Sequence, residues 1–220
     1  MRIGILGAGG MAGGLGAGWA RAGHEVMVGG RDPGKAAALA ARLGPGARSG
    51  TLAQAAGHGE VVLLAVPAAA AEEVLAAAGA GGGALAGRPL IDCTNAVDHE
   101  RMVPATAGGP SMAERVAAAA PGAHVVKAFN LCHEAVWRMT PPAFDGEPLL
   151  VPLCGDDPGA LETVGGLVGD LGCVPVDGGG LVRAGALEAT MVFMVGLWFR
   201  GVDARSVLPP LKYAFGSAGT

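Results

Sequence analysis

The first residues of this chain that could do chemistry are the glycines of a turn near its N-terminus. Gly7 and Gly9 stand at the first and third positions of a Gly-x-Gly-x-x-Ala pattern that Ala12 ends. In such a turn Gly7 permits the tight bend, Gly9 lets the backbone approach a pyrophosphate, and Ala12 lets the next helix pack closely. Free N–H groups at the start of that helix favour an anion. We therefore predict a dinucleotide site here, with Gly10 and Met11 among its contacts.

A second group of residues bears on which nicotinamide cofactor the turn would hold. A site for NAD usually places Asp or Glu about 20 residues beyond the glycines, where it accepts a hydrogen bond from the ribose 2′-hydroxyl. This chain has Gly30 and Arg31 there, and Asp32 followed by Pro33 is typical of a helix N-cap. Arg31 and Lys35 would flank a 2′-phosphate, which favours NADP. The alternative is a solvated basic loop.

The elements that must position these residues follow from the alternation of short apolar runs with alanine-rich stretches. The expected strands are Arg2–Leu6, Val26–Gly29, Val61–Ala65, Pro89–Asp92 and Val125–Ala128. The expected helices are Met11–Ala22, Pro33–Leu43, Ala69–Ala78 and Ser111–Ala120. This alternation predicts an α/β protein, with a Rossmann-type doubly wound parallel sheet.

The loops that leave the strands extend the candidate site. In sheets of this kind the carboxyl ends of the strands carry the ligand-facing loops. We therefore expect Val66 and Pro67, Asn95, and the segment that begins at Ala128 to converge on the glycine turn and to contact the cofactor.

The pattern of the sequence changes after about residue 145. This region is expected to contain strands at Leu149–Leu153 and Cys173–Val176, a helix at Pro158–Leu171 and an apolar helix at Leu181–Phe199. We predict an NADP-binding domain over 1–145 and a small C-terminal lobe over 146–220 for substrate binding and dimerisation. The last helix is apolar around most of its circumference, which favours a homodimer over burial in the core of one subunit.

Composition narrows the class of protein. The 220 residues carry a net charge of −4 and no basic run, which argues against nucleic-acid binding. The N-terminus has no pattern of a signal peptide, and the apolar run Met191–Phe199 is short for a membrane span, so we expect a cytoplasmic protein without a membrane partner. The four cysteines show no pairing or metal-ligand spacing and are expected to be reduced thiols, with no metal site.

Seven short motifs, taken together and in order, carry a family resemblance. They are Gly7–Ala12, Gly30–Asp32, Ala65–Pro67, Asp92–Asn95, Val126–Asn130, Gly155–Pro158 and Leu187–Glu188. With these motifs the chain resembles the NADPH-dependent coenzyme F420 reductase family, although that family commonly has serine or threonine where Gly30 stands. The resemblance implies a Rossmann domain, a homodimer and hydride exchange between NADP and a deazaflavin. It also implies that Arg31 and Lys35 hold the 2′-phosphate.

The identity of the acceptor decides whether a catalytic side chain is needed. Hydride transfer between two stacked rings needs orientation more than an acid, whereas a carbonyl, enone or imine needs a proton donor. The candidate donors are His133 and Lys127, followed by His99 and Tyr213. A backbone-bonded His133 and a salt-bridged, structural Lys127 are the alternatives. Cys132 has no activating neighbour in the sequence.

The resulting functional hypothesis is an NADP(H)-dependent oxidoreductase whose second substrate is a deazaflavin, coenzyme F420. One alternative is direct reduction of a small carbonyl, enone or imine. Another is a non-catalytic NADPH-binding sensor or subunit, whose substrate face would be filled by His133, Trp137 and the loop 97–110.

Overall fold

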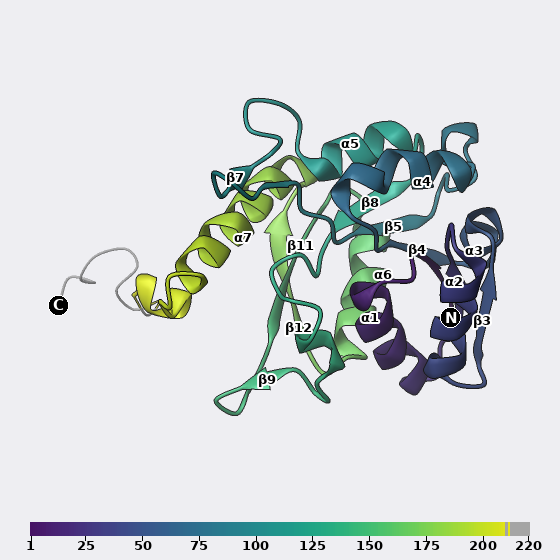
Figure 1. Cartoon of the computed structure of the whole chain (residues 1–220), viewed down its shortest axis with the longest axis horizontal. Helices are drawn as coiled ribbons and strands as arrows, with labels where there is room; N and C mark the ends of the chain where they lie inside the picture. The colour runs from purple at the N-terminus through teal and green to yellow at the C-terminus, as the bar shows by residue number, and fades with distance from the viewer. Residues whose placement is uncertain (210, 212–220) are drawn as a thin grey trace.

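The computed structural model describes residues 1–209 and 211, and the chain in it is built around one large sheet (Figure 1). The strands of this sheet are β1 (Arg2–Leu6), β2 (Glu25–Gly29), β3 (Ala47–Gly50), β4 (Val61–Leu64), β5 (Pro89–Asp92), β8 (His124–Lys127), β11 (Leu150–Gly155) and β12 (Val174–Gly179). Two short ribbons pair β6 (Val97–Asp98) with β7 (Val103–Pro104) and β9 (Ala143–Phe144) with β10 (Glu147–Pro148). The α-helices are α1 (Gly10–Arg21), α2 (Pro33–Leu43), α3 (Leu52–His58), α4 (Ala71–Ala77), α5 (Met112–Ala119), α6 (Pro158–Gly169) and α7 (Ala184–Trp198).

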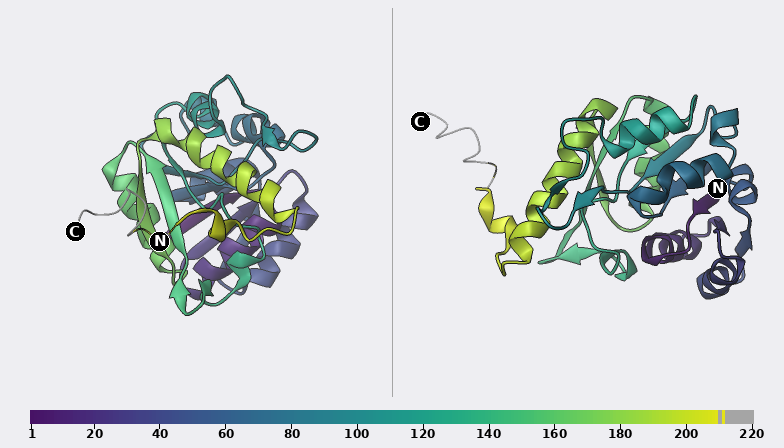
Figure 2. Two further views of the ribbon diagram at one scale, coloured as in Figure 1. Left: turned by 90° about the vertical axis from the view of Figure 1, so that its left-hand side faces the viewer. Right: turned by 45° about the horizontal axis from the view of Figure 1, so that its top comes forward.

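The strand order of the sheet is β12-β11-β8-β5-β4-β1-β2-β3. Neighbouring strands are parallel except that β11 runs antiparallel to β8. Helices α1 and α2 cover one face, and α4 and α5 cover the other (Figure 2). The predicted Rossmann-like α/β fold is confirmed, and the predicted strands and helices lie close to the observed bounds.

The core explains why the strands are apolar on both sides. Two clusters of buried side chains lie on opposite faces of the sheet. Trp19 of α1 and Leu167 of α6 belong to one cluster, and Leu75 of α4 and Val116 of α5 belong to the other. Because both faces are covered, all four residues of β4 are buried.

The sequence prediction lacked one strand of the main sheet, β3, and one α-helix, α3, as well as the four short strands of the two ribbons. A local signal for α3 exists in the chain. Thr51 accepts a hydrogen bond from the backbone N–H of Gln54, and the Gln54 side chain accepts one from the backbone of Thr51, which together make a capping box. Strands β11 and β12 extend the main sheet, and the domain boundary near residue 146 stays a prediction.

Helix α7 projects from the sheet beside β7 (Figure 1). The segment Leu181–Trp198 is long and apolar enough to cross a membrane by length and composition alone. The expectation that this region is too short for a membrane span considered only the shorter run Met191–Phe199. The core helices of soluble proteins can be equally long and apolar, so one such helix is weak support for a membrane span. Only 17% of the segment is buried in the chain, and Phe193 and Phe199 are 59% and 78% exposed. The subunit core therefore leaves much of this apolar helix uncovered.

Candidate functional site

The glycine turn between β1 and α1 has the geometry that a pyrophosphate requires. Gly7 has φ of +126°, and a Cβ on it would collide with the carbonyl oxygen of Ala65, so only glycine fits there. Gly9 is the N-cap residue of α1, and a Cβ on it would meet nothing within 4 Å. Ala12 lies in the first turn of α1 and is fully buried. The space in front of Gly9 is therefore open, at the positive end of a helix.

Two cavities meet at this turn. The basic cavity has a volume of about 620 Å³, and its walls include Gly7, Gly30, Arg31, Asp32 and Lys35. The polar cavity has a volume of about 450 Å³, and its walls include Gly10, Met11, Thr94, Asn95, Phe129, Asn130, His133, Glu134 and Met191. Gly9, Ala65, Val66 and Pro67 line both cavities. An elongated dinucleotide would therefore find one continuous surface that passes over the glycines.

The charged side chains around the basic cavity include a helix cap and an ion pair. Asp32 caps α2, and its Oδ1 accepts from the backbone N of Lys35 at 3.1 Å, so this carboxylate is turned to its own helix as expected. The exposed guanidinium of Arg31 lies 3.4 Å from the carboxylate of Glu73 on α4. A Cβ on Gly30 would meet its nearest neighbours, which include the Cβ of Ala36, at 3.6 Å, an ordinary contact.

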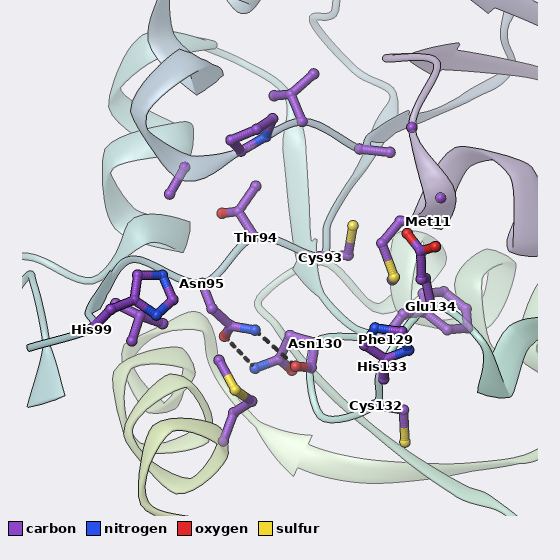
Figure 3. Close-up of a pocket in the computed structure, with 18 residues that line it drawn as sticks. Met11, Cys93, Thr94, Asn95, His99, Phe129, Asn130, Cys132, His133 and Glu134 are labelled. Carbon is purple, nitrogen blue, oxygen red and sulfur yellow. Dashed lines mark hydrogen bonds between the residues drawn. The ribbon is translucent and has the colours of Figure 1, made fainter. Parts of the chain in front are cut away.

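The walls of the polar cavity come from the ends of three neighbouring strands, as predicted. Val66 and Pro67 follow β4, Asn95 follows β5, and Phe129 and Asn130 follow β8 (Figure 3). The ring of Phe129 packs edge-on against two tryptophans, and its φ of +61° is unusual for a bulky residue. A strained backbone that packing holds in place is common at functional sites.

A pair of amides crosses this cavity wall. Asn95 Nδ2 donates to the backbone O of Asn130 at 2.8 Å, and Asn130 Nδ2 donates to Asn95 Oδ1 at 3.0 Å (Figure 3). The backbone carbonyl fixes the orientation of the first amide, and the first amide fixes the second. Asn130 Oδ1 is left buried without a partner in the described part of the chain. Such an orphan acceptor fits a ligand with an N–H group.

Two expectations about this cavity need correction. Ala128 does not line it, because this residue is fully buried and donates its backbone N–H to the carbonyl of Asp92 at 3.1 Å. The next two residues, Phe129 and Asn130, take its place. Trp137 does not fill the substrate face, because it is buried against Phe129 and Gly14. His133, and His99 of the loop 97–110, do line the cavity, so the sensor hypothesis stays an alternative.

The histidines stand where a proton donor would be useful. His133 lines the polar cavity with an exposed ring, and its Nδ1 accepts from the backbone N of Ala135 at 3.2 Å (Figure 3). This bond leaves Nε2 to face a ligand. His99 lines the same cavity from the other side. Tyr213 lies outside the described residues.

Lys127 is held in a buried ionic cluster away from both cavities. Its Nζ lies 2.8 Å from Asp92 Oδ2 and 2.8 Å from Glu188 Oε1, and it also donates to the carbonyl oxygen of Thr94. Burial acts to lower the pKa of Lys127, but the two carboxylates outweigh it and hold the pKa above its ordinary value. The ammonium is therefore fixed and charged, as in the structural alternative, and it is poorly suited to give up a proton.

The cysteines near the cavity are inert as nucleophiles. Burial, together with the charge of Asp92, raises the pKa of Cys93 to about 12. Burial, with the neighbouring Cys173, raises the pKa of Cys132 to about 11. All four cysteines of the chain are free. Within residues 1–209 and 211, no group of three His, Cys, Asp or Glu side chains is arranged to hold a metal ion.

Glu134 and Met191 are among the residues of the polar cavity that were not predicted from the sequence. The carboxylate of Glu134 packs directly over Gly10, where a Cβ would overlap it, and it lies 2.8 Å from Arg138 Nη2. Met191 reaches the cavity from α7. Glu134 and Arg138 are four residues apart, and this spacing is a weak local signal for their ion pair. No local feature of the sequence indicates that Met191 lies at the site.

The chain is similar in sequence and in fold to known proteins. Residues 2–96 match the family described as NADP oxidoreductase, coenzyme F420-dependent. A solved structure from Arthrobacter sp. FB24, whose proposed activity is F420-dependent NADP reduction, has a TM-score of 0.80 at 28% identity over 91% of this chain and 94% of its own. A reductive aminase from Aspergillus terreus, in complex with NADPH and ethyl levulinate, has a TM-score of 0.66 at 22% identity over 94% of this chain and 69% of its own.

A curated relative extends the comparison beyond solved structures. Metalloreductase STEAP3 of Rattus norvegicus is 30% identical over 197 residues. The match covers 90% of this chain and 38% of that relative, so the chain spans well under half of the length of STEAP3.

The fold and the glycine turn are those of a Rossmann-type protein, and the comparisons first show a class to which the chain is similar, that of NAD(P)-dependent oxidoreductases. The predicted resemblance to the NADP oxidoreductases that depend on coenzyme F420 is then confirmed, over residues 2–96 by the family match and over 91% of the chain by the Arthrobacter structure.

Proposed function

We propose that this protein transfers a hydride between NADP(H), bound across the glycine turn, and a second molecule in the polar cavity. The observation that carries the proposal is the continuity of the two cavities at Gly9. The basic cavity would take the adenosine end, with Arg31 and Lys35 at the 2′-phosphate. The polar cavity would take the nicotinamide end and the acceptor. The residues proposed to bind the cofactor are Gly7, Gly9, Gly10, Met11, Gly30, Arg31, Lys35, Val66, Pro67 and Asn95.

In this proposal NADPH supplies the hydride, and the chain contributes binding and orientation. The start of α1 provides free N–H groups and the positive end of a helix to the pyrophosphate. The amides of Asn95 and Asn130 and the side chain of Met11 line the region beyond Gly9, where the ring end would lie.

The acceptor that we favour is the deazaflavin coenzyme F420. Support comes from the family match and from the chemistry of the cavity. Transfer between stacked rings needs no acid, and Lys127 and Cys132 are both unsuited to acid–base or nucleophilic work. The test is NADPH oxidation with purified coenzyme F420, measured beside a panel of carbonyl, enone and imine compounds. Turnover with coenzyme F420 is expected, and its absence would refute this assignment.

Direct reduction of an imine or carbonyl is the second candidate. His133 and His99 on the cavity wall favour it, because either could protonate the developing anion. Replacement of His133 by alanine separates the two candidates. Turnover of coenzyme F420 should stay within about twofold, whereas reduction of an imine should fall about a hundredfold, the typical contribution of a general acid. Tight NADPH binding without any turnover would instead support the sensor.

We also propose a homodimer that covers α7. Support comes from the exposed apolar side chains of this helix, among them Phe193 and Trp198. Light scattering at micromolar concentration should give twice the subunit mass. Phe193→Asp should give a monomer or an insoluble protein, because the unpaired charge would be buried twice by symmetry. A monomeric wild-type protein would refute the dimer. The four free cysteines support a reducing, cytoplasmic location.

A further inference from the structure

A buried ionic cluster joins three elements behind the polar cavity. Asp92 ends β5, Lys127 ends β8, and Glu188 lies in the second turn of α7. The side chains of all three are almost completely buried, and both carboxylates lie 2.8 Å from the ammonium. None of the three lines either cavity. We refer to these residues as the buried triad.

Backbone donors compensate the excess negative charge of the triad. Glu188 accepts from the backbone N of Met112 at 3.0 Å and of Ala113 at 3.1 Å, which are free N–H groups in the first turn of α5. Asp92 Oδ1 accepts from the backbone N of Thr94 at 2.8 Å and from its hydroxyl at 2.7 Å. A buried cluster is tolerated when every charge is paired in this way, and removal of one partner leaves another charge unpaired.

The triad determines the placement of two walls of the polar cavity. Thr94 is held on both sides, since its N–H and hydroxyl donate to Asp92 and its carbonyl accepts from Lys127. The next residue, Asn95, carries the amide that pairs with Asn130. On the other side, Glu188 anchors α7 one turn before Met191, which lines the cavity. The basic cavity has no contact with this network.

We propose that Glu188 is a positioning residue, which ties α7 and the Thr94–Asn95 segment together and thereby shapes the nicotinamide and acceptor end of the site. This inference rests on the proposed function, because it assigns the polar cavity to that end. It makes an asymmetric prediction for the nucleotide. Loss of Glu188 should disturb the nicotinamide end and leave the adenosine end as it is.

The test compares Glu188→Gln with Glu114→Gln. Glu114 also serves the first turn of α5, where it accepts from the backbone N of Ser111 at 2.8 Å, but it is exposed and does not touch the triad. For each variant we would measure the affinity for adenosine 2′,5′-bisphosphate, the fluorescence enhancement of bound NADPH, and kcat and KM with coenzyme F420. The first probe reads the adenosine end and the second reads the nicotinamide ring without any acceptor.

For Glu188→Gln we expect the affinity for adenosine 2′,5′-bisphosphate to stay within twofold, the fluorescence enhancement to be at least halved, and kcat to fall at least tenfold. Glu114→Gln should stay within twofold of wild type in every measurement. If Glu188→Gln does not fold, the triple variant Asp92→Asn, Lys127→Met and Glu188→Gln removes all three charges together, so that none is left unpaired, and the same asymmetric loss is expected.

Several results would overturn the inference. A folded variant with wild-type fluorescence and kcat would show that the triad only stabilises the fold. Equal losses at the adenosine and nicotinamide ends would show the same. A different result would refute the proposed function. A wild-type protein that binds neither adenosine 2′,5′-bisphosphate nor NADPH would refute NADP(H) binding itself, and the inference would then fail as well.

Discussion

Replacement of Arg31 by alanine tests the choice of cofactor most directly. The guanidinium lines the basic cavity together with Lys35, and the acid that would select NADH is turned away into a helix cap. A hydrogen bond to a charged group contributes about 1.5–3 kcal/mol in proteins. The side chain of Arg31 is 62% exposed, so solvent screens it, and its contribution should lie around or below the lower end of that range. We expect a loss of about 1–2 kcal/mol for NADPH, which is about a five- to thirtyfold increase in Kd.

The ion pair between Arg31 and Glu73 provides an internal control. The carboxylate of Glu73, 3.4 Å from the guanidinium, would compete with a 2′-phosphate for the same group. Exposed pairs of this kind contribute about 0.2–1 kcal/mol. Glu73→Gln should therefore strengthen NADPH binding by up to about fivefold. The two variants of one ion pair should shift the affinity in opposite directions, which a loss of stability could not produce.

The assay is titration calorimetry with NADPH and with NADH at one fixed ionic strength, because salt screens exposed charges. NADH affinity should change by less than twofold in both variants. If Arg31→Ala weakens the two nucleotides equally, or if Glu73→Gln weakens NADPH, the guanidinium does not hold the 2′-phosphate and the argument for NADP fails.

Three further predictions follow from single residues. Gly9→Val should fold normally, as circular dichroism would show, because the space around its Cβ is empty. It should nevertheless lose its affinity for both nucleotides in calorimetry, and retained affinity would exclude the turn as the pyrophosphate site. Gly30→Ser should bind NADPH about fivefold more tightly, or about 1 kcal/mol, because its side chain fits and adds a donor, and an unchanged Kd would contradict this. Burial raises the pKa of Cys132 to about 11, so its thiol is protonated below that pH. Alkylation of Cys132 should therefore be slow at pH 8 and accelerate toward pH 11. Rapid alkylation at pH 8 would contradict the burial of this thiol.

The parts of the site that could be predicted from sequence depend on local signals. The glycine turn needs a backbone that only Gly7 allows, and the Asp32 cap is followed by a proline at the first position of its helix. Convergence of the loops after β4, β5 and β8 follows from parallel strands alone. These features depend on residues that are close in sequence, or on a general property of the sheet.

Other parts depend on contacts that the sequence does not display. Ala128 and Phe129 are adjacent at the end of β8, and the left-handed backbone of Phe129 decides which of the two reaches the cavity. Trp137 turns inward because a small residue of α1, Gly14, leaves room for it. The partners of Lys127 are 35 and 61 residues away along the chain, so its structural role becomes visible only in the fold.

The antiparallel strand β11 explains why the C-terminal half can take part in the site at all. Cys154 of β11 pairs with Lys127 on one side and with Gly179 of β12 on the other. The end of β12 therefore lies level with the carboxyl end of β8, two strands away. Helix α7 begins five residues after Gly179, and its second turn brings Glu188 within 2.8 Å of the ammonium. The register of β11 thus places Glu188 behind the polar cavity and Met191 in its wall, and a helix that leaves most of its apolar surface uncovered still carries one of the cavity walls.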